Sequence, residues 1–379
     1  MFDFDTPVDR SGTGSHKWDR YEGRDVIPLW VADSDFRAAP AVLDALEARV
    51  AHGVFGYTHV TQELEQVVCA HLLRSYDWAV RPDWLVWMPG VVPALNVLCR
   101  AIGRPADQIV TFTPVYPPLM SAPVLAGREL IKVCLAHRNG RYQLDLNALE
   151  AAITPSTKLL LLCSPHNPVG RVWSRDELAD LMQIAKRHDL VVGSDDIHAG
   201  LVLDEDKRHT PVATLSEDAA ARTVTLMSPS KTFNIAGLGC AFAVISDAGL
   251  RAAFCRRMQG IMPFVNLFGY TATLAAYRDG REWLEAQLGY LRDNRDLVDR
   301  EIQRMPGLEI VHVEATHLAW IDARAMGARN PTRFFEEAGV GLSDGAEFDA
   351  PGFLRLNFGC SRILLREALA RMARAMGGC

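Results

Sequence analysis

The chain has 379 residues, of which 49% are hydrophobic and 23% are charged, and its formal net charge is -6 at pH 7. This length exceeds that of a usual compact domain, so we expect two domains. The mildly acidic balance, with no block of lysine and arginine, argues against a nucleic-acid or membrane-surface protein and favours an enzyme that acts on a small molecule.

The amino-terminal twenty residues are polar and lack the apolar stretch of a secretory signal. No apolar run approaches the roughly 20 residues that span a bilayer. We therefore expect a cytoplasmic protein without a membrane segment. The eight cysteines have neither C-x-x-C nor metal-ligand spacing, so we interpret them as reduced thiols and expect no metal site.

Short apolar segments alternate with turns or helical patterns through the middle of the chain. This alternation predicts an α/β fold with a mostly parallel, buried sheet and helices on both faces. Ser174 and Glu177 have the spacing of a capping box, which predicts the start of a helix between two strands. The expected strands of the sheet are 84–88, 108–112, 130–134, 159–163, 190–194, 223–227 and 240–245.

After about residue 247 the pattern changes to long amphipathic helices. Strands are expected again at 308–313, 318–321 and 353–358, followed by an amphipathic helix over 363–376, which together predict a smaller α+β domain. The expected division is an N-terminal segment that packs with the small domain, residues 1–50, a large domain, residues 51–285, and the C-terminal small domain, residues 286–379.

Lys231 lies in the sequence Ser228-Pro229-Ser230-Lys231-Thr232, directly after an expected strand. Ligands of α/β proteins bind at such strand ends. A lysine with a lowered pKa can form a Schiff base, and neighbouring hydroxyl groups can bind a phosphate. A solvated surface lysine is the alternative interpretation of this cluster taken alone.

Other expected strand ends carry residues that suit the same ligand. Asp195 follows an apolar strand, where a buried acid needs a cationic partner such as a protonated pyridine nitrogen. Asn167 lies in a rigid Asn-Pro-Val-Gly turn, and Val91 and Val92 begin a helix whose free N–H groups favour an anion. Tyr116 is placed to stack on a ring. Taken singly, Asp195 also fits a helix cap, Asn167 a structural turn and Tyr116 simple packing.

These motifs resemble those of the fold-type I pyridoxal-phosphate (PLP) enzymes, the aspartate aminotransferase superfamily. More narrowly, the chain is similar to the cystathionine β-lyase, or C-S lyase, branch. The likeness runs from Pro28-Leu29-Trp30-Val31-Ala32-Asp33 to Phe353-Leu354-Arg355-Leu356-Asn357-Phe358 and covers nearly the whole chain. It implies a large PLP-binding domain, with a mixed but mostly parallel seven-stranded sheet flanked by helices, and a smaller α+β domain.

The resemblance also implies a role for each polar residue around the ring of the cofactor. Lys231 would hold PLP as a Schiff base and then act as the base at the α-carbon of an amino acid. Asp195 would pair with the pyridine nitrogen and keep it protonated. Asn167 and His198 would lie near the phenolic oxygen, and Tyr116 would stack on the ring.

The phosphate of PLP would be held by two hydroxyl groups, those of Ser228 and Ser230, and by the backbone amides of Val91 and Val92. Tyr57 would reach the phosphate of the neighbouring subunit and contribute to catalysis there. The resemblance therefore implies a homodimer with shared active sites.

Arg355 would clamp the carboxylate of the amino-acid substrate, a task that suits the planar guanidinium group, and Ala32 would also contact the substrate. A surface strand arginine is the alternative for Arg355. The chain departs from the branch at Ser34, where methionine is usual, and at His317, where tyrosine is common. Both are candidates for the side-chain pocket, although His317 is more simply read as a structural histidine. Two further departures lie beside Asp195, at Asp196 and Gly200.

Two reactions begin from the same loss of the α-proton. Elimination of a thiolate from the β-carbon gives a thiol, pyruvate and ammonia, whereas return of a proton to the cofactor gives transamination. Many aminotransferases carry a phosphate-binding arginine eight residues after the Schiff-base lysine, but Gly239 stands there. The sequence thus favours a C-S β-lyase over an aminotransferase. A specialised elimination or replacement enzyme and a PLP-binding regulatory protein are further alternatives.

Overall fold

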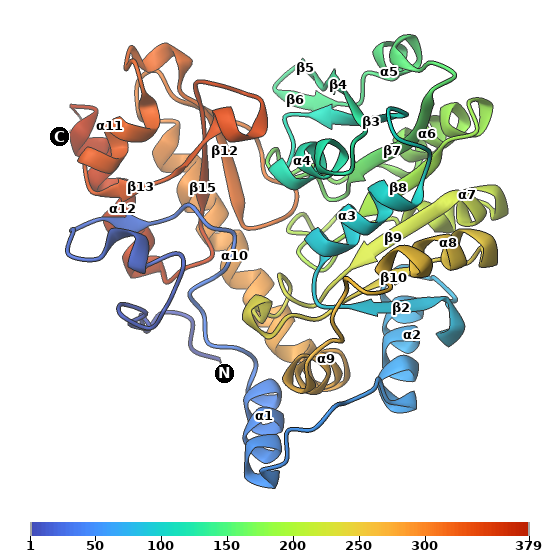
Figure 1. Cartoon of the computed structure of the whole chain (residues 1–379). Coiled ribbons are helices and arrows are strands. Elements are labelled where there is room, and N and C mark those ends of the chain that lie inside the picture. Colours follow the sequence, from blue (N-terminus) through green and yellow to red (C-terminus); the bar gives the residue numbers. More distant parts are fainter. Residues whose placement is uncertain (1, 378–379) are drawn as a thin grey trace.

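The computed structural model describes residues 2–377. Its larger part is built on a seven-stranded sheet in the order β2-β10-β9-β8-β7-β3-β4 (Figure 1). Strand β10 is antiparallel to both of its neighbours, and the other neighbouring pairs are parallel. All seven expected strands are confirmed: β2 (Leu85–Met88), β3 (Gln108–Thr113), β4 (Glu129–Cys134), β7 (Thr157–Cys163), β8 (Val191–Asp195), β9 (Thr223–Met227) and β10 (Ala241–Val244).

Helices cover both faces of this sheet, which explains why its strands are apolar without alternation. In β7, Leu159 and Leu161 pack into one core cluster, whereas Leu160 and Leu162 pack into another on the opposite face. Helices α3 (Val91–Ala101), α4 (Pro117–Leu125) and α8 (Ala248–Met258) contribute to the first cluster, and α5 (Leu146–Ala152), α6 (Arg175–Arg187) and α7 (Glu217–Arg222) contribute to the second. The capping box expected at Ser174 and Glu177 is confirmed at the start of α6.

The C-terminal part contains a second, antiparallel sheet in the order β11-β12-β15-β14. Its strands are β11 (Glu309–Ile310), β12 (Leu318–Asp322), β14 (Ser343–Asp344) and β15 (Phe353–Asn357), and its helices are α11 (Pro331–Glu337) and α12 (Arg362–Ala375). The two long helices α9 (Leu267–Asp279) and α10 (Arg281–Ile302) lead into this part. The expected strands and the terminal helix are therefore found there, and β14 is an additional short strand.

The beginning of the chain lies against its end (Figure 1). Strand β1 (Ile27–Pro28) pairs in parallel with β13 (Val340–Gly341). Helix α1 (Pro40–His52) instead packs against α9, as does α2 (Gln62–Tyr76), and the hairpin of β5 (Ala136–Arg138) and β6 (Arg141–Gln143) stands apart. The residue boundaries of the two expected domains stay a prediction.

No helix among the described residues combines the length and the apolar character that crossing a membrane requires.

Candidate active site

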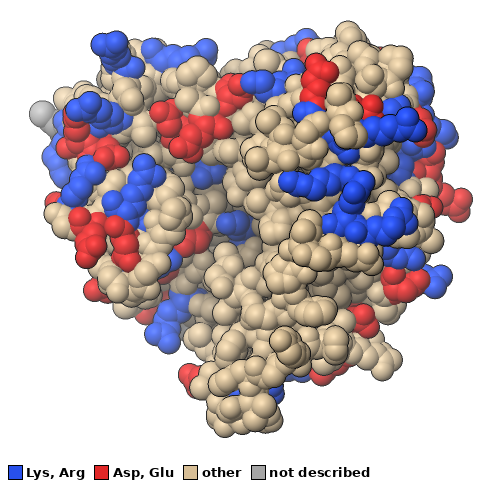
Figure 2. Space-filling model, in the orientation of Figure 1, with Lys and Arg blue, Asp and Glu red and all other residues tan. Residues whose placement is uncertain are grey.

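The carboxyl ends of five strands meet at one edge of the seven-stranded sheet. Strands β2, β3, β7, β8 and β9 point the same way, so the loops that follow them lie together. A cavity of about 420 Å³ opens there, and Figure 2 shows the surface hollowed between the two parts of the molecule. Of the residues expected at the site, the cavity wall includes Ala32, Val91, Val92, Tyr116, Asn167, Asp195, His198, Ser230, Lys231 and Arg355.

Lys231 presents an amine with lowered basicity to this cavity. Its Nζ donates a hydrogen bond to the carbonyl oxygen of Ala32 at 2.9 Å. Burial lowers the pKa of Lys231 from 10.5 to about 8, although the carboxylate of Asp33 acts in the opposite direction. A free amine at this position is thus available near neutral pH, which the solvated surface lysine of the alternative interpretation would not provide.

Asp195 is the last residue of β8, and only 2% of its surface is exposed. One of its carboxylate oxygens accepts the backbone N–H of Ile197 at 3.2 Å, and within residues 2–377 it forms no ion pair. Burial raises the pKa of Asp195 from 3.8 to about 7. A cationic group in the cavity would relieve this cost, and the carboxylate would hold a proton on that group.

Arg355 lies on β15 and is buried rather than on the surface. Its Nη1 donates to Oδ1 of Asn167 at 3.1 Å, and its Nη2 donates to the Trp30 carbonyl at 2.8 Å and to the Ser343 hydroxyl at 3.2 Å. Its guanidinium carbon is 4.6 Å from the centroid of the Phe348 ring. Burial lowers the pKa of Arg355 to about 10, but the group stays charged at neutral pH. The fixed guanidinium suits a carboxylate ligand.

The start of α3 offers backbone donors to the same cavity. Gly90 is the N-cap residue and supplies no side-chain cap, so the first-turn N–H groups at Val91 and Val92 are free to meet an anion. Ser230 lines the cavity close by. Ser228 does not: its hydroxyl donates to the Cys240 carbonyl at 2.7 Å and accepts the Ser230 N–H at 3.1 Å. Its expected contact with a phosphate stays a prediction.

Two buried histidines stand side by side at the inner end of the site. The ring centroids of His198 and His317 are 6.3 Å apart. Burial lowers the pKa of His317 to about 3 and that of His198 well below 6.5, so both rings are neutral. Only His198 lines the cavity; His317 lies behind the wall, with its Nε2 at 3.4 Å from the Ala32 carbonyl. Ser34 is also buried outside the cavity lining.

Tyr57 lies away from the cavity and is fully exposed in the single chain. It belongs to the segment between α1 and α2, which projects from the body of the molecule (Figure 1). Tyr116, in contrast, is close to Asp195, whose carboxylate adds to the effect of burial in raising the pKa of the Tyr116 phenol. The structure therefore brings together the expected ring-binding residues but not Tyr57.

Sequence reasoning did not single out several residues of the outer wall. Trp30 lies within a motif already noted above, but His16, Ser343, Glu347 and Phe348 carry no local signal. They reach the cavity because the start of the chain and the loops beside β14 and β15 fold back over the sheet edge. Such a wall depends on tertiary contacts between distant segments.

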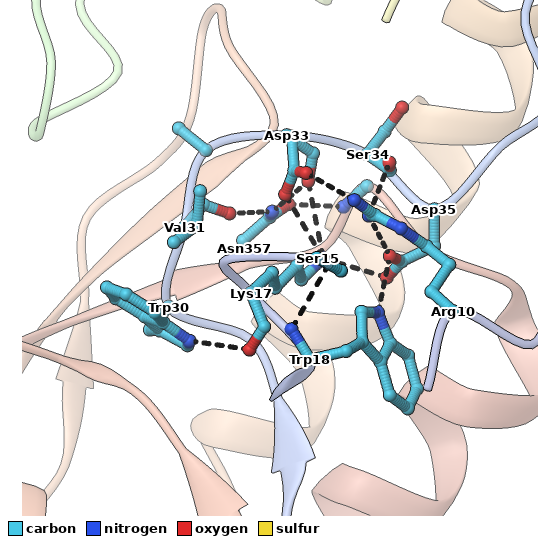
Figure 3. A network of polar contacts seen from close by, with 12 residues as sticks. Arg10, Ser15, Lys17, Trp18, Trp30, Val31, Asp33, Ser34, Asp35 and Asn357 are labelled. Atoms are coloured by element: carbon cyan, nitrogen blue, oxygen red, sulfur yellow. Dashed lines mark hydrogen bonds and ion pairs between the residues drawn. The ribbon is translucent and has the colours of Figure 1, made fainter. Parts of the chain in front are cut away.

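A buried ion cluster anchors the wall from behind (Figure 3). Lys17 is fully buried and its Nζ lies 2.7 Å from a carboxylate oxygen of Asp35. Arg10 bridges Asp35 and Asp33, with both distances 2.7 Å. Asn357 of β15 donates to the carbonyl of Asp33 at 2.7 Å. These contacts fix the segment that carries the Ala32 carbonyl.

Comparison with known proteins points to one family. The model of aminotransferase class I and II matches residues 24–372. The chain is 38% identical to cystathionine beta-lyase PatB of Bacillus subtilis (strain 168), over 98% of this chain and 99% of that protein.

Solved structures agree over the full length. The crystal structure of OvoB is 48% identical, with a TM-score of 0.97, and the match covers 99% of both chains. Cystalysin of Treponema denticola, whose structure contains a pyridoxal 5'-phosphate cofactor, is 32% identical with a TM-score of 0.96 over 100% of this chain and 99% of that chain.

Proposed function

The chain belongs to the class I and II aminotransferase family, and from this premise we propose that it is a PLP-dependent C-S β-lyase. Its reaction is α,β-elimination from a cysteine thioether such as L-cystathionine, which gives a thiol, pyruvate and ammonia. The observation that carries the proposal is the meeting of Lys231, Asp195 and Arg355 in one cavity of a chain that is 38% identical to a cystathionine beta-lyase.

The groups left without partners in the cavity match the two ends of PLP. Asp195 is a buried carboxylate that forms no ion pair within residues 2–377, which suits the protonated pyridine nitrogen. The uncapped start of α3 suits the phosphate. His198 has a buried Nδ1 that no group of the described residues 2–377 hydrogen-bonds. The amide oxygen of Asn167 is bound by Arg355, which leaves the Asn167 Nδ2 group to donate to the phenolic oxygen. The residues present therefore fit the cofactor.

PLP, when bound, supplies an electron sink that stabilises negative charge at the α-carbon. The residues of the chain bind the substrate and move the protons. Arg355 binds and orients the substrate carboxylate, and Asp195 holds the proton on the ring nitrogen. The Lys231 amine takes the α-proton, and the resulting ammonium can donate to the Ala32 carbonyl, which lies 2.9 Å from Nζ. Tyr116 lines the same cavity, where its ring would stack on the cofactor.

The backbone at Gly239 favours the lyase over an aminotransferase. Its φ is +59°, a left-handed conformation that side chains rarely adopt, and an added Cβ would lie 3.3 Å from the Pro89 carbonyl. The phosphate-binding arginine of many aminotransferases is thus disfavoured by the conformation of this chain as well as absent from its sequence. Backbone amides and hydroxyl groups are left to hold the phosphate.

The test of the function is to incubate the PLP-loaded protein with L-cystathionine and measure pyruvate and free thiol, with and without an added keto acid. A lyase forms pyruvate and thiol in equal amounts, and the keto acid makes no difference. An aminotransferase converts the added keto acid to an amino acid and releases no thiol, and that result would overturn the proposal.

We further propose that the enzyme works in the cytoplasm as a homodimer with shared active sites. Exposed apolar side chains gather near Tyr57: Val54, Phe55, Ile261 and Phe264 are each more than half exposed. Phe55 packs on Phe268 and His59 on Phe264, so the two exposed segments touch each other. A two-fold interface would bury this apolar surface twice and bring Tyr57 to the partner's phosphate.

The dimer has a direct test. Lys231→Ala protein is refolded together with protein altered at Tyr57, each inactive alone. If the two residues meet across the interface, some heterodimers contain one intact site and activity returns. Confirmed heterodimers without activity would reject the shared site.

A further inference from the structure

A second cavity of about 500 Å³ adjoins the active-site cavity and lies toward the C-terminal part of the molecule. The two share three lining residues, Trp30, Ser343 and Glu347. Two of these contact Arg355: its Nη2 donates to the Trp30 carbonyl and to the Ser343 hydroxyl. A substrate bound through Arg355 therefore lies next to this junction, the part of the wall that the two cavities share.

Most charges in the second cavity neutralise each other. Arg24 pairs with Glu336 at 2.8 Å, and Arg333 pairs with Glu337 at 2.8 Å. The carboxylate of Asp344 caps a short helix by accepting the N–H of Ala346. These contacts pair two charges of each sign and give the Asp344 carboxylate a hydrogen-bond donor.

One charge of each sign stays unpaired at the junction. Within residues 2–377, the carboxylate of Glu347 has no hydrogen bond or ion pair, and neither has the guanidinium of Arg20. The guanidinium carbon of Arg20 is 4.3 Å from the centroid of the Trp30 ring, which fixes the cation on the junction wall. Burial lowers the pKa of Arg355, and Glu347 is near enough to the active site for its charge to oppose part of that lowering.

A ligand with both an ammonium and a carboxylate group matches this pair of free charges. We propose that Glu347 and Arg20 form a subsite for a zwitterionic, amino-acid-like group at the far end of the substrate thioether. Glu347 binds the ammonium and Arg20 the carboxylate, while the Trp30 ring contacts the methylene groups between. This inference rests on the lyase function and adds to it: the subsite selects the thiol that leaves.

The experiment compares two cysteine thioethers of similar length, L-cystathionine with its zwitterionic end and S-butyl-L-cysteine with a neutral one. For each, kcat/KM for pyruvate release is measured, and affinity is measured by titrating the absorbance of the PLP-loaded protein. Glu347→Gln and Arg20→Gln should each lower the ratio of cystathionine to S-butyl-cysteine, in kcat/KM and in affinity, at least about fivefold. Arg20→Lys should restore part of the loss.

Glu337→Gln is the matched control, because it removes the same charge from the same cavity but from a residue already paired with Arg333. The cystathionine to S-butyl-cysteine ratio of this variant should stay within about twofold of the wild-type ratio. The subsite would be overturned if Glu347→Gln and Arg20→Gln left the cystathionine to S-butyl-cysteine ratio unchanged. It would also be overturned if Glu337→Gln lowered that ratio by as much as they do. If no thioether gives pyruvate, the lyase function fails, and the affinity ratios still decide whether the subsite exists.

Discussion

Replacing Asp195 with asparagine should make the protein prepared without PLP more stable, although the same change should harm catalysis. The folded protein holds the Asp195 proton more tightly than the unfolded chain does, because its pKa is raised from 3.8 to about 7. As pH rises above 3.8, the unfolded chain ionises first, and stability falls until the pH passes 7. Asparagine has the same shape and does not titrate, so it avoids this loss.

The size of this stability effect follows from the shift in the pKa of Asp195. A difference of about three pH units, at about 1.4 kcal/mol per unit, amounts to about 4 kcal/mol above pH 7. At pH 5 most of this loss of wild-type stability has not yet occurred. The advantage of Asp195→Asn over wild type should therefore grow by about 3 kcal/mol between pH 5 and pH 8.

The measurement is urea unfolding of both PLP-free proteins across this pH range. The difference between their free energies of unfolding cancels the contributions of the other titrating groups. Asp196→Asn is the control: the Asp196 carboxylate is paired with His209 at 2.7 Å and is also bound by Ser194, so its loss should destabilise the fold. A difference between Asp195→Asn and wild type that does not change with pH would refute the reasoning.

Three other outcomes are expected. Lys231→Ala should abolish the PLP adduct that borohydride traps on the wild-type protein, and mass mapping of an adduct to another lysine would contradict the assignment. Arg355→Lys should raise KM for the amino-acid substrate at least tenfold with a smaller change in kcat, measured by steady-state kinetics, because an ammonium cannot bind a carboxylate bidentately. Lys17→Met should lower the free energy of unfolding in urea by about 3 kcal/mol, because Asp33 and the buried Asp35 then share one cation, Arg10. Arg24→Ala, at a half-exposed pair, should lower it by less than about 1 kcal/mol.

The inner half of the site could be predicted from sequence, because it follows from the sheet. Asp195 ends β8, while Asn167 and Lys231 lie in the loops that follow β7 and β9. The apolar runs of these strands are visible in the sequence, and parallel strands end at the same edge. The start of α3 at Val91 has the same origin.

The outer half could not be predicted in this way. Glu347 and Arg20 reach the cavity only through folding of distant segments, and nothing in their neighbouring residues marks them. Ser228 lies in the lysine motif, and its contact with a phosphate stays a prediction; in the structure its hydroxyl donates to the Cys240 carbonyl. His317 has a partner in the Ala32 carbonyl and lies behind the wall, as a structural histidine would.

The ion cluster around Lys17 has a consequence for biosynthesis. The cavity wall at Ala32 is held by Asn357, whose hydrogen bond to the Asp33 carbonyl joins residues 324 positions apart, so the wall is synthesised well before its anchor. Until then a nascent chain can form the sheet with Lys231 and Asp195, while the wall lacks its C-terminal anchor. Domains generally fold in the order of synthesis, but here the segment at Ala32 waits for β15. We therefore expect the pocket to close around the cofactor only after β15 has been synthesised.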